Sequence, residues 1–219
     1  MITFKDIQQN PDIRTYIQQA DASLYALGYT EHSFAHVERV SSVSAKILTT
    51  LGYPARTVEL AKIAGFLHDI GNLVNRHNHS QSGALMAFEL LCELGMSADE
   101  VSLVVSAIGN HDEGTGVAVN PVAAALILAD KSDVRRSRVR NQEITTFDIH
   151  DRVNYSVVSS TLTINESKTD ILLSLDIDTS ISPVMDYFEI FLERMIMCRK
   201  AAQSLGLAFR LSMNGQSMM

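Results

Sequence analysis

Residues 121–134 of this 219-residue chain read PVAAALILADKSDV. The apolar residues follow a helical pattern, and Asp130 falls on the same stripe as Ala123, Ile127 and Val134. A carboxylate that points into an apolar core is costly unless a cation compensates its charge. The segment therefore predicts a helix that buries Asp130 beside a positively charged partner.

Two further apolar helices carry candidate partners for the same cation. His36 shares a helical stripe with Val40, Val43, Ile47 and Leu51, and the pair His68-Asp69 closes an apolar helix that contains Ile63, Ala64 and Leu67. Alone, each histidine fits an ordinary core residue, and Asp130 fits a carboxylate paired with Lys131 or Arg135. Together, imidazole nitrogens and carboxylate oxygens on three inward-facing helices predict a metal site.

These motifs, in this order, resemble one known family. His36, the stretch FLHDIG at residues 66–71 and the stretch LADKSD at residues 128–133 resemble the HD-domain superfamily of metal-dependent phosphohydrolases. The resemblance implies a helical bundle in which His36, His68, Asp69 and Asp130 hold a metal ion. It also implies that a water molecule activated by the metal attacks a phosphoester.

Two more histidines extend the resemblance. His79 opens a helix and His111 stands just past the end of another, and both resemble the extra ligands of the binuclear branches, which include the HD-GYP phosphodiesterases. The resemblance then implies two divalent ions, of iron, manganese or a similar metal. Asp69 would bridge them, with His36, His68 and Asp130 on one ion and His79 and His111 on the other. Catalytic roles fall to Asp69, Asp130 and the neighbouring Asp112, an outer base or ligand orienter.

Departures from the HD-GYP pattern leave other functions open. Asn72 stands where that group has lysine, and residues 114–117, GTGV, replace its Gly-Tyr-Pro element, so cyclic di-guanylate specificity is not implied. The six-ligand pattern also resembles di-iron oxygenases built on the same domain, which keeps oxidation of a small polar substrate as an alternative. A third possibility is a non-catalytic signalling module that metals stabilise.

One basic segment is a candidate for substrate binding. Residues 131–140 read KSDVRRSRVR, and Lys131, Arg135 and Arg138 fall on one helical face beside Asp130. Arginine forks suit phosphate oxygens, and Asn72 joins these residues as a predicted substrate contact. The competing interpretation is a solvated helix end whose cations favour the C-terminal dipole.

Composition limits the partners. A formal net charge of −7 argues against a nucleic-acid polymer as ligand, whereas a local basic patch could still bind a small phosphorylated substrate. The polar residues 1–10 hold no signal segment, and apolar runs such as 122–129 are far shorter than the ~20 residues of a membrane span. We expect a cytoplasmic protein without a membrane partner, and we expect Cys92 and Cys198 to be reduced core cysteines.

The pattern changes near residue 150. Before it lie helices, so residues 1–150 are expected to form the HD domain. After it, Val158, Leu162 and Ile164 alternate with other side chains, the alternation resumes over 171–177 and again over 207–213, and a helix runs from Pro183 to Gly206. The fold class is therefore mainly α, with residues 151–219 forming a small α+β unit: a three-stranded antiparallel sheet with one long helix. This unit is expected either to cover the site or to form a homodimer.

Overall fold

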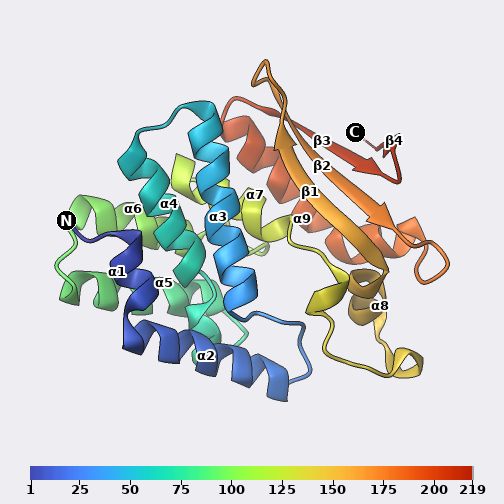
Figure 1. Cartoon of the computed structure of the whole chain (residues 1–219), viewed down its shortest axis with the longest axis horizontal. Coiled ribbons are helices and arrows are strands. Elements are labelled where there is room, and N and C mark those ends of the chain that lie inside the picture. Colours follow the sequence, from blue (N-terminus) through green and yellow to red (C-terminus); the bar gives the residue numbers. More distant parts are fainter. Residues whose placement is uncertain (219) are drawn as a thin grey trace.

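A computed structural model describes residues 1–218 and shows a mainly helical chain that ends in a small sheet (Figure 1). The helical part comprises α1 (Phe4–Gln9), α2 (Pro11–Ala26), α3 (Phe34–Leu51), α4 (Ala55–Leu67), η1 (Ile70–Leu73), α5 (His79–Glu93), α6 (Ala98–Gly109) and α7 (Pro121–Lys131). Short helices η2 (Arg136–Arg138), η3 (Ile144–Thr146) and α8 (Ile149–Ser156) connect it to β1 (Val157–Ile164), β2 (Asp170–Ile177), α9 (Val184–Ser204), β3 (Ala208–Met213) and β4 (Gln216–Ser217). The predicted fold class is confirmed. Among residues 1–218, no helix combines the length and the hydropathy that a membrane span requires.

Local signals explain where the helices begin and end. The side chain of Asn10 accepts hydrogen bonds from the backbone N–H groups of Asp12 and Ile13, and Asn120 caps α7 in the same way. Gly52 ends α3 with a φ of 85°, a left-handed conformation that glycine adopts without strain. These caps fix the ends of α3 and α7, two of the helices that carry predicted ligands.

Helices α3, α4 and α7 pack against one another and form the centre of the bundle. Gly65 of α4 faces the backbone of α3 so closely that a Cβ atom placed there would lie 2.7 Å from Cα and 2.8 Å from N of Ser41. The missing side chain of Gly65 therefore sets the distance between the helix that carries His36 and the helix that leads to His68.

Replacing Gly65 with alanine should destabilise the metal-free protein. The added methyl group must push α3 away from α4, and overpacking of this kind costs roughly 1–3 kcal/mol. Urea unfolding with a chelator present measures the loss. Gly109→Ala is the matched control, because its Cβ would meet only Ala84 Cβ at an ordinary 3.5 Å. Equal stabilities for the two variants would contradict the close approach.

The strand order of the sheet is β1-β2-β3-β4. Strand β1 pairs antiparallel with β2, but β3 pairs parallel with β2, and the short β4 returns antiparallel to β3. The expected three-stranded antiparallel sheet was thus wrong in strand number and in the direction of β3. The reason is α9, which carries the chain from the end of β2 back to the edge where β2 began, as a parallel connection requires.

The buried face of β1 also differs from expectation. Val158 is 64% exposed, whereas Val157 is fully buried. The pairing shifts between Val157 and Ser159, so Val158 is the extra residue of a β-bulge and the alternation changes face there. Cys92 likewise proved exposed, whereas Cys198 is buried in α9 as expected.

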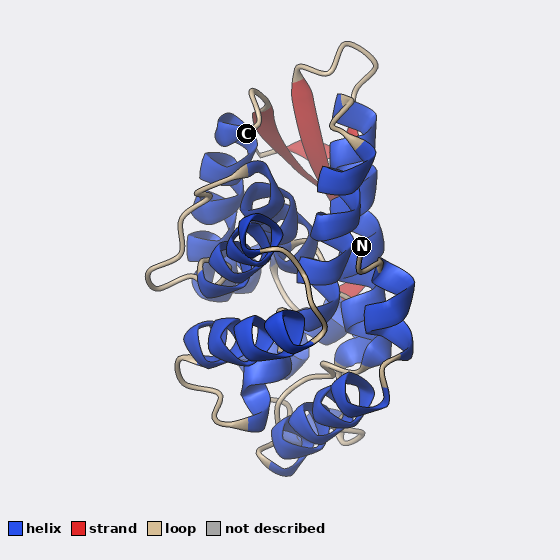
Figure 2. Cartoon of the chain, turned by 90° about the vertical axis from the view of Figure 1, so that its left-hand side faces the viewer, coloured by secondary structure: helices blue, strands red, loops and turns tan. Residues whose placement is uncertain are grey.

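Helix α9 covers one face of the sheet and packs on α7 with its other side. Figure 2 shows the strands mainly in the upper half of the view, partly hidden behind the helices. The side chains of Phe191, Met195 and Cys198 on α9 are buried together with Leu173 and Leu211 of the sheet. The division at residue 150 stays a prediction, and α9 links the two parts through the helix that carries Asp130.

Candidate metal centre

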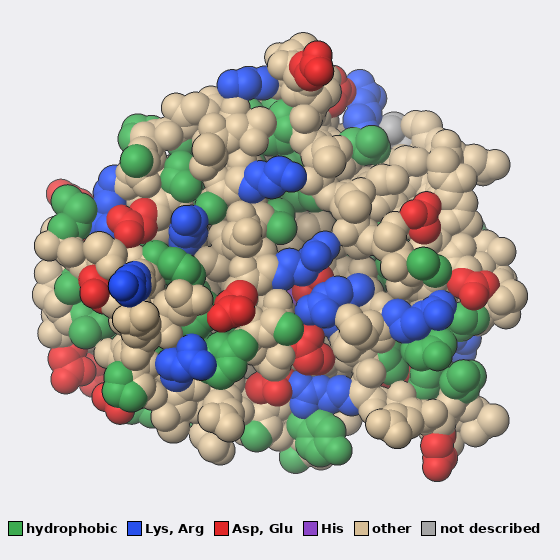
Figure 3. Space-filling model, viewed as in Figure 1, with side chains coloured by type: hydrophobic (Ala, Val, Ile, Leu, Met, Phe, Trp, Pro, Cys, Tyr) green, Lys and Arg blue, Asp and Glu red, His purple; other side chains and the backbone are tan. Residues whose placement is uncertain are grey.

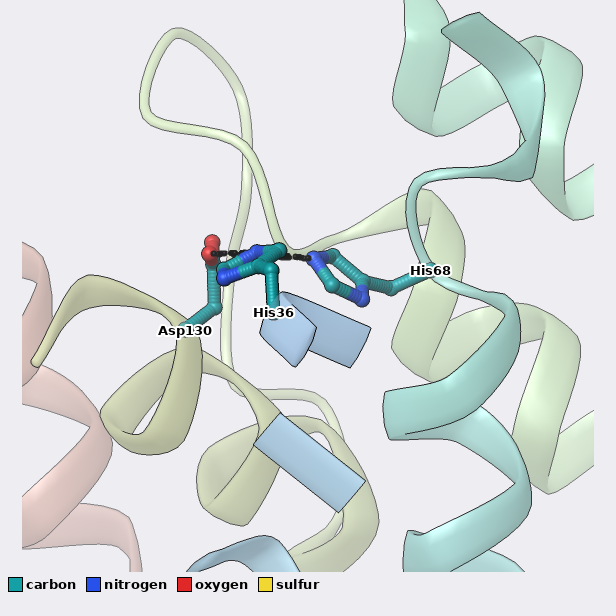
Figure 4. Close-up of side chains that lie close together, drawn as sticks. All are labelled: His36, His68 and Asp130. Atoms are coloured by element: carbon teal, nitrogen blue, oxygen red, sulfur yellow. Dashed lines mark hydrogen bonds and ion pairs between the residues drawn. The ribbon is translucent and has the colours of Figure 1, made fainter. Parts of the chain in front are cut away.

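Three separate helix ends bring the first group of ligands together. His36 lies in the first turn of α3, His68 directly follows α4, and Asp130 lies at the end of α7. In Figure 4 these three side chains point toward one another from their different elements. Asp69 follows His68 and precedes η1, so its carboxylate enters the same space.

The separations of the ligand atoms match those around a divalent ion. Nε2 of His36 lies 3.3 Å from Nε2 of His68, 3.4 Å from Oδ2 of Asp69 and 3.4 Å from Oδ1 of Asp130. Nε2 of His68 lies 3.2 Å from Oδ2 of Asp69 and 3.7 Å from Oδ1 of Asp130. Donor atoms at about 2.1 Å from one ion are roughly 3.0–3.4 Å apart in octahedral or tetrahedral coordination. These four residues therefore fit one metal ion.

The carboxylate of Asp69 has an oxygen that needs a cation. Asp69 is 6% exposed, and its Oδ2 accepts no hydrogen bond from any of residues 1–218. Its other oxygen, Oδ1, accepts a hydrogen bond of 3.0 Å from Nδ2 of Asn72. A buried carboxylate oxygen without a partner is costly, and a metal ion between Asp69, His36 and His68 would satisfy it.

The histidine tautomers suit metal binding through Nε2. Each of the four predicted ligand histidines donates its Nδ1–H to an oxygen: His36 to Asp133 Oδ2 at 2.8 Å, His68 to Gly65 O at 2.9 Å, His79 to Arg76 O at 3.1 Å and His111 to Ile108 O at 2.7 Å. In its neutral form, each ring then presents the lone pair of Nε2 to the site.

A second group lies beside the first. Nε2 of His79 is 3.1 Å from Nε2 of His111 and 3.5 Å from Oδ1 of Asp69. Ligand atoms of His68, Asp69 and His111 also lie within 4.8 Å of one another. Because Oδ2 of Asp69 faces the first group and Oδ1 faces His79, this carboxylate is placed between both groups. All six predicted ligands thus gather in one cluster.

The electrostatic field of the cluster favours positive charge at the first group. Burial opposes protonation of His68, but the carboxylates of Asp69 and Asp130 outweigh it and raise the pKa of His68 to about 10. At the second group, burial lowers the pKa of His79 to about 4 and holds the pKa of His111 well below its usual value. His79 and His111 are therefore neutral near pH 7, as metal ligands must be.

Asp133 is a residue whose role the sequence did not indicate. It is 1% exposed and accepts the Nδ1–H of His36, while Nε of Arg39 and Nε of Arg135 each lie 2.9 Å from its Oδ1. Nη1 of Arg138 donates to its backbone oxygen at 2.8 Å. Asp133 therefore fixes the tautomer and orientation of His36 from behind the ligand.

A cavity of about 380 Å³ opens onto the cluster. Asp69, His79, His111 and Asp130 line it, together with the predicted substrate contacts Lys131 and Arg138. Nζ of Lys131 lies 2.8 Å from Oδ2 of Asp130 and 3.3 Å from Oε2 of Glu113. Lys131 is thus engaged by carboxylates, whereas Arg138 reaches the cavity from a buried position.

Apart from the predicted ligands His36 and His68, three predicted residues are not among the described residues that line this cavity: Asn72, Asp112 and Arg135. Arg135 turns its guanidinium toward Asp133 and Glu31, and Asn72 uses its amide to hold Asp69 and to accept from Arg76. Neighbouring groups thus engage both side chains, and the substrate contacts expected of them stay a prediction. The carboxylate of Asp112 lies 3.8 Å from Nζ of Lys131, and burial, followed by the adjacent Glu113, raises its pKa to about 6. Its predicted catalytic role stays a prediction.

Two further basic residues line the cavity that were not predicted from the sequence. Arg76, in the loop before α5, and Arg194, on α9, both line it. Nη1 of Arg76 lies 3.4 Å from Nε2 of His79. Spacing could have hinted at Arg76, three residues before His79, but Arg194 is distant in sequence and only the packing of α9 on α7 brings it to the site. His32, four residues before His36, lines the cavity as well.

Comparisons with known proteins relate this chain to one family. Residues 33–151 match the model of the HD-domain family. Ribonuclease Y of Thermosipho melanesiensis is 29% identical over 117 residues, which is 53% of this chain and 22% of that protein. An uncharacterized protein of Methanocaldococcus jannaschii is 22% identical over 160 residues, covering 63% of this chain and 61% of that one.

The chain thus spans about a fifth of the ribonuclease Y chains that it matches. A crystal structure described as a predicted HD superfamily hydrolase from an uncultured Thermotogales bacterium superposes with a TM-score of 0.43 and 23% identity. That alignment covers 62% of this chain and 75% of the other.

Proposed function

Because the chain belongs to the HD-domain family of metal-dependent phosphohydrolases, we propose that it hydrolyses a phosphoester of a small, nucleotide-sized substrate. Two divalent ions, held by the six clustered ligands, would assist the reaction. When bound, such ions lower the pKa of a water molecule and offset the charge that develops on phosphoryl oxygens. The substrate is then attacked without a serine or cysteine nucleophile.

The observation that supports this proposal best is a cavity that both predicted metal ligands and arginines line. Asp69 and Asp130 line it beside Arg76 and Arg138. Oxidation of a small polar substrate without an anionic group gives no reason for guanidinium groups at this place, whereas phosphate oxygens do. The arrangement therefore favours phosphoester hydrolysis over the oxygenase alternative.

Arg138 is held in a way that leaves one nitrogen available. Its Nε donates to Glu31 O at 2.9 Å and its Nη1 to Asp133 O at 2.8 Å. Within residues 1–218, Nη2 forms no hydrogen bond, although the side chain is only 6% exposed. A buried guanidinium fixed at two nitrogens is preorganised to donate the remaining N–H groups to a phosphoryl oxygen.

The cavity volume and the surface charge both favour a small substrate. A volume of about 380 Å³ falls within the usual range of small-molecule sites. On the face drawn in Figure 3, basic and acidic side chains are mixed, and none of the described side chains visible there is a histidine. A net charge of −7 adds to this argument against a long polyanion.

A substrate panel tests the proposal. Protein loaded with Mn²⁺ or Fe²⁺ is incubated with nucleoside monophosphates, cyclic nucleotides, aryl phosphates and a short single-stranded RNA, the last because of the ribonuclease Y relatives. We expect metal-dependent release of phosphate or monoester from at least one small substrate and none after chelation. Substrate-dependent oxygen uptake without phosphoester cleavage would overturn the proposal in favour of the oxygenase.

Replacing Arg138 with methionine should reduce kcat/KM by roughly one to two decades, because a charged hydrogen bond contributes about 1.5–3 kcal/mol. Metal content, measured by mass spectrometry, should stay unchanged. Arg135→Met serves for comparison, because its guanidinium contacts Asp133 and Glu31 outside the cavity. It should change kcat/KM by less than Arg138→Met does, and the reverse order would contradict the placement of Arg138 at the substrate.

A further inference from the structure

Helix α9 contributes to the cavity although it lies outside the matched HD-domain residues 33–151. Phe191 and Arg194, one turn apart on α9, line the cavity together with the metal ligands. Phe191 is 1% exposed, so it fixes the wall, and the side chain of Arg194 is 27% exposed. The part of the chain after the HD domain therefore supplies a cation to the site.

Arg194 is held in place but keeps free donors. Its Nε lies 2.6 Å from Oε1 of Glu113, and its guanidinium carbon lies 4.4 Å from the centre of the Phe191 ring. Neither Nη atom forms a hydrogen bond with any of residues 1–218. A guanidinium that lines a cavity and is fixed by an ion pair and a ring, with both Nη groups unpaired, is suited to bind an anion.

The basic side chains that line the cavity are held by different neighbouring residues. Arg76 is attached beside His79, and Arg138 is attached behind His36 through Asp133. Arg194 instead approaches from α9 and rests on Glu113, in the loop after His111. Lys131 stands between the carboxylates of Asp130 and Glu113 and is engaged by both. Arg194 is therefore a further cation at the cavity, held separately from those next to the predicted metal ligands.

We propose that Arg194 binds a second anionic group of the substrate, a phosphate or a carboxylate, while the metals, Arg76 and Arg138 receive the scissile phosphoryl group. This inference rests on the proposed function for the scissile group. The inference narrows the substrate class to phosphoesters that carry a second anionic group. Arg194 would then determine the specificity for that group. An uncharged substituent at that place would leave the Nη groups without a partner.

Non-hydrolysable probes test the inference without turnover. Calorimetry on the metal-loaded protein compares methylphosphonate, with one anionic group, against α,ω-bisphosphonates with linkers of one, three and five carbons. At least one bisphosphonate should bind the wild type more tightly than methylphosphonate. Arg194→Met should weaken that bisphosphonate roughly ten- to a hundredfold, as expected for loss of one charged hydrogen bond, and should change methylphosphonate binding less than about twofold. Arg194→Lys should restore part of the loss.

Arg199→Met, on an exposed position of the same helix, is the matched control and should leave both affinities unchanged. Equal weakening of both probes by Arg194→Met would show that Arg194 only supports the fold of the site, and no weakening of either would show that it does not meet the ligand. Either result, or the absence of any preference for bisphosphonates, overturns the inference. If the protein binds bisphosphonates selectively through Arg194 but cleaves no phosphoester, the proposed function is refuted. The anion site at Arg194 is then retained.

Discussion

Asp69→Asn should strip the protein of both metal ions and reduce phosphoester hydrolysis by roughly a thousandfold or more, because metal ions supply the nucleophile and the charge stabilisation. Its two carboxylate oxygens face the two histidine groups, and Oδ2 has no hydrogen-bond donor among the described residues. Asparagine keeps the size of the side chain but removes its charge. Metal content by mass spectrometry after desalting, together with kcat/KM, measures the effect.

Two further variants make this test specific. His79→Ala should lose one ion and keep the other, because His79 lies 3.1 Å from His111 on the side away from His36. Asp148→Asn, which removes another carboxylate that lines the cavity, should keep both ions. Two ions retained by Asp69→Asn would exclude its bridging position, and a wild type that never exceeds one equivalent would exclude the binuclear assignment.

Asp133→Asn should weaken metal binding by roughly 10- to 100-fold, as is typical when the partner behind a ligand histidine is lost. The protein should also lose stability. Asp133 is 1% exposed and compensates Arg39, Arg135 and Arg138, and removal of one partner from a buried ion pair costs about 3–5 kcal/mol. Metal titration and urea unfolding of the metal-free protein measure the two effects separately.

Asp170→Asn is the control for charge removal. Asp170 pairs with Arg210, whose side chain is 54% exposed, so this variant should change stability by no more than about 1 kcal/mol. If Asp133→Asn behaves like Asp170→Asn in both measurements, then Asp133 does not hold His36.

The parts of the site that the sequence predicted are those encoded by short local patterns. His68-Asp69 follows an apolar helix, and His36 and Asp130 each lie on an apolar stripe, so their inward direction followed from helical periodicity. Helical periodicity cannot identify the residue on another helix with which a side chain pairs. Asp133 looked like one more charged residue of a basic segment, and its contact with His36 depends on how α3 lies beside α7.

The same limit applies to the last third of the chain. The alternation of apolar and polar side chains located β1, β2 and β3. Parallel and antiparallel strands show the same alternation, so the pattern could not give the direction of β3. It also could not reveal the bulge at Val158, where one extra residue reverses the alternation. Arg194 was missed because its neighbours on α9 fit an amphipathic helix, and its pairing with Glu113 spans both parts of the fold.

The parallel pairing of β3 with β2 has a consequence for folding and for truncation. β1 and β2 can pair as soon as both have been synthesised, but β3 can join only after the 21 residues of α9 have folded back. Until then the β2 backbone, with the apolar Ile171, Leu173 and Leu175, has an open edge that can recruit strands from other chains. A protein shortened to end after Ile177 should therefore aggregate, whereas one that ends before β1 has no such edge to protect.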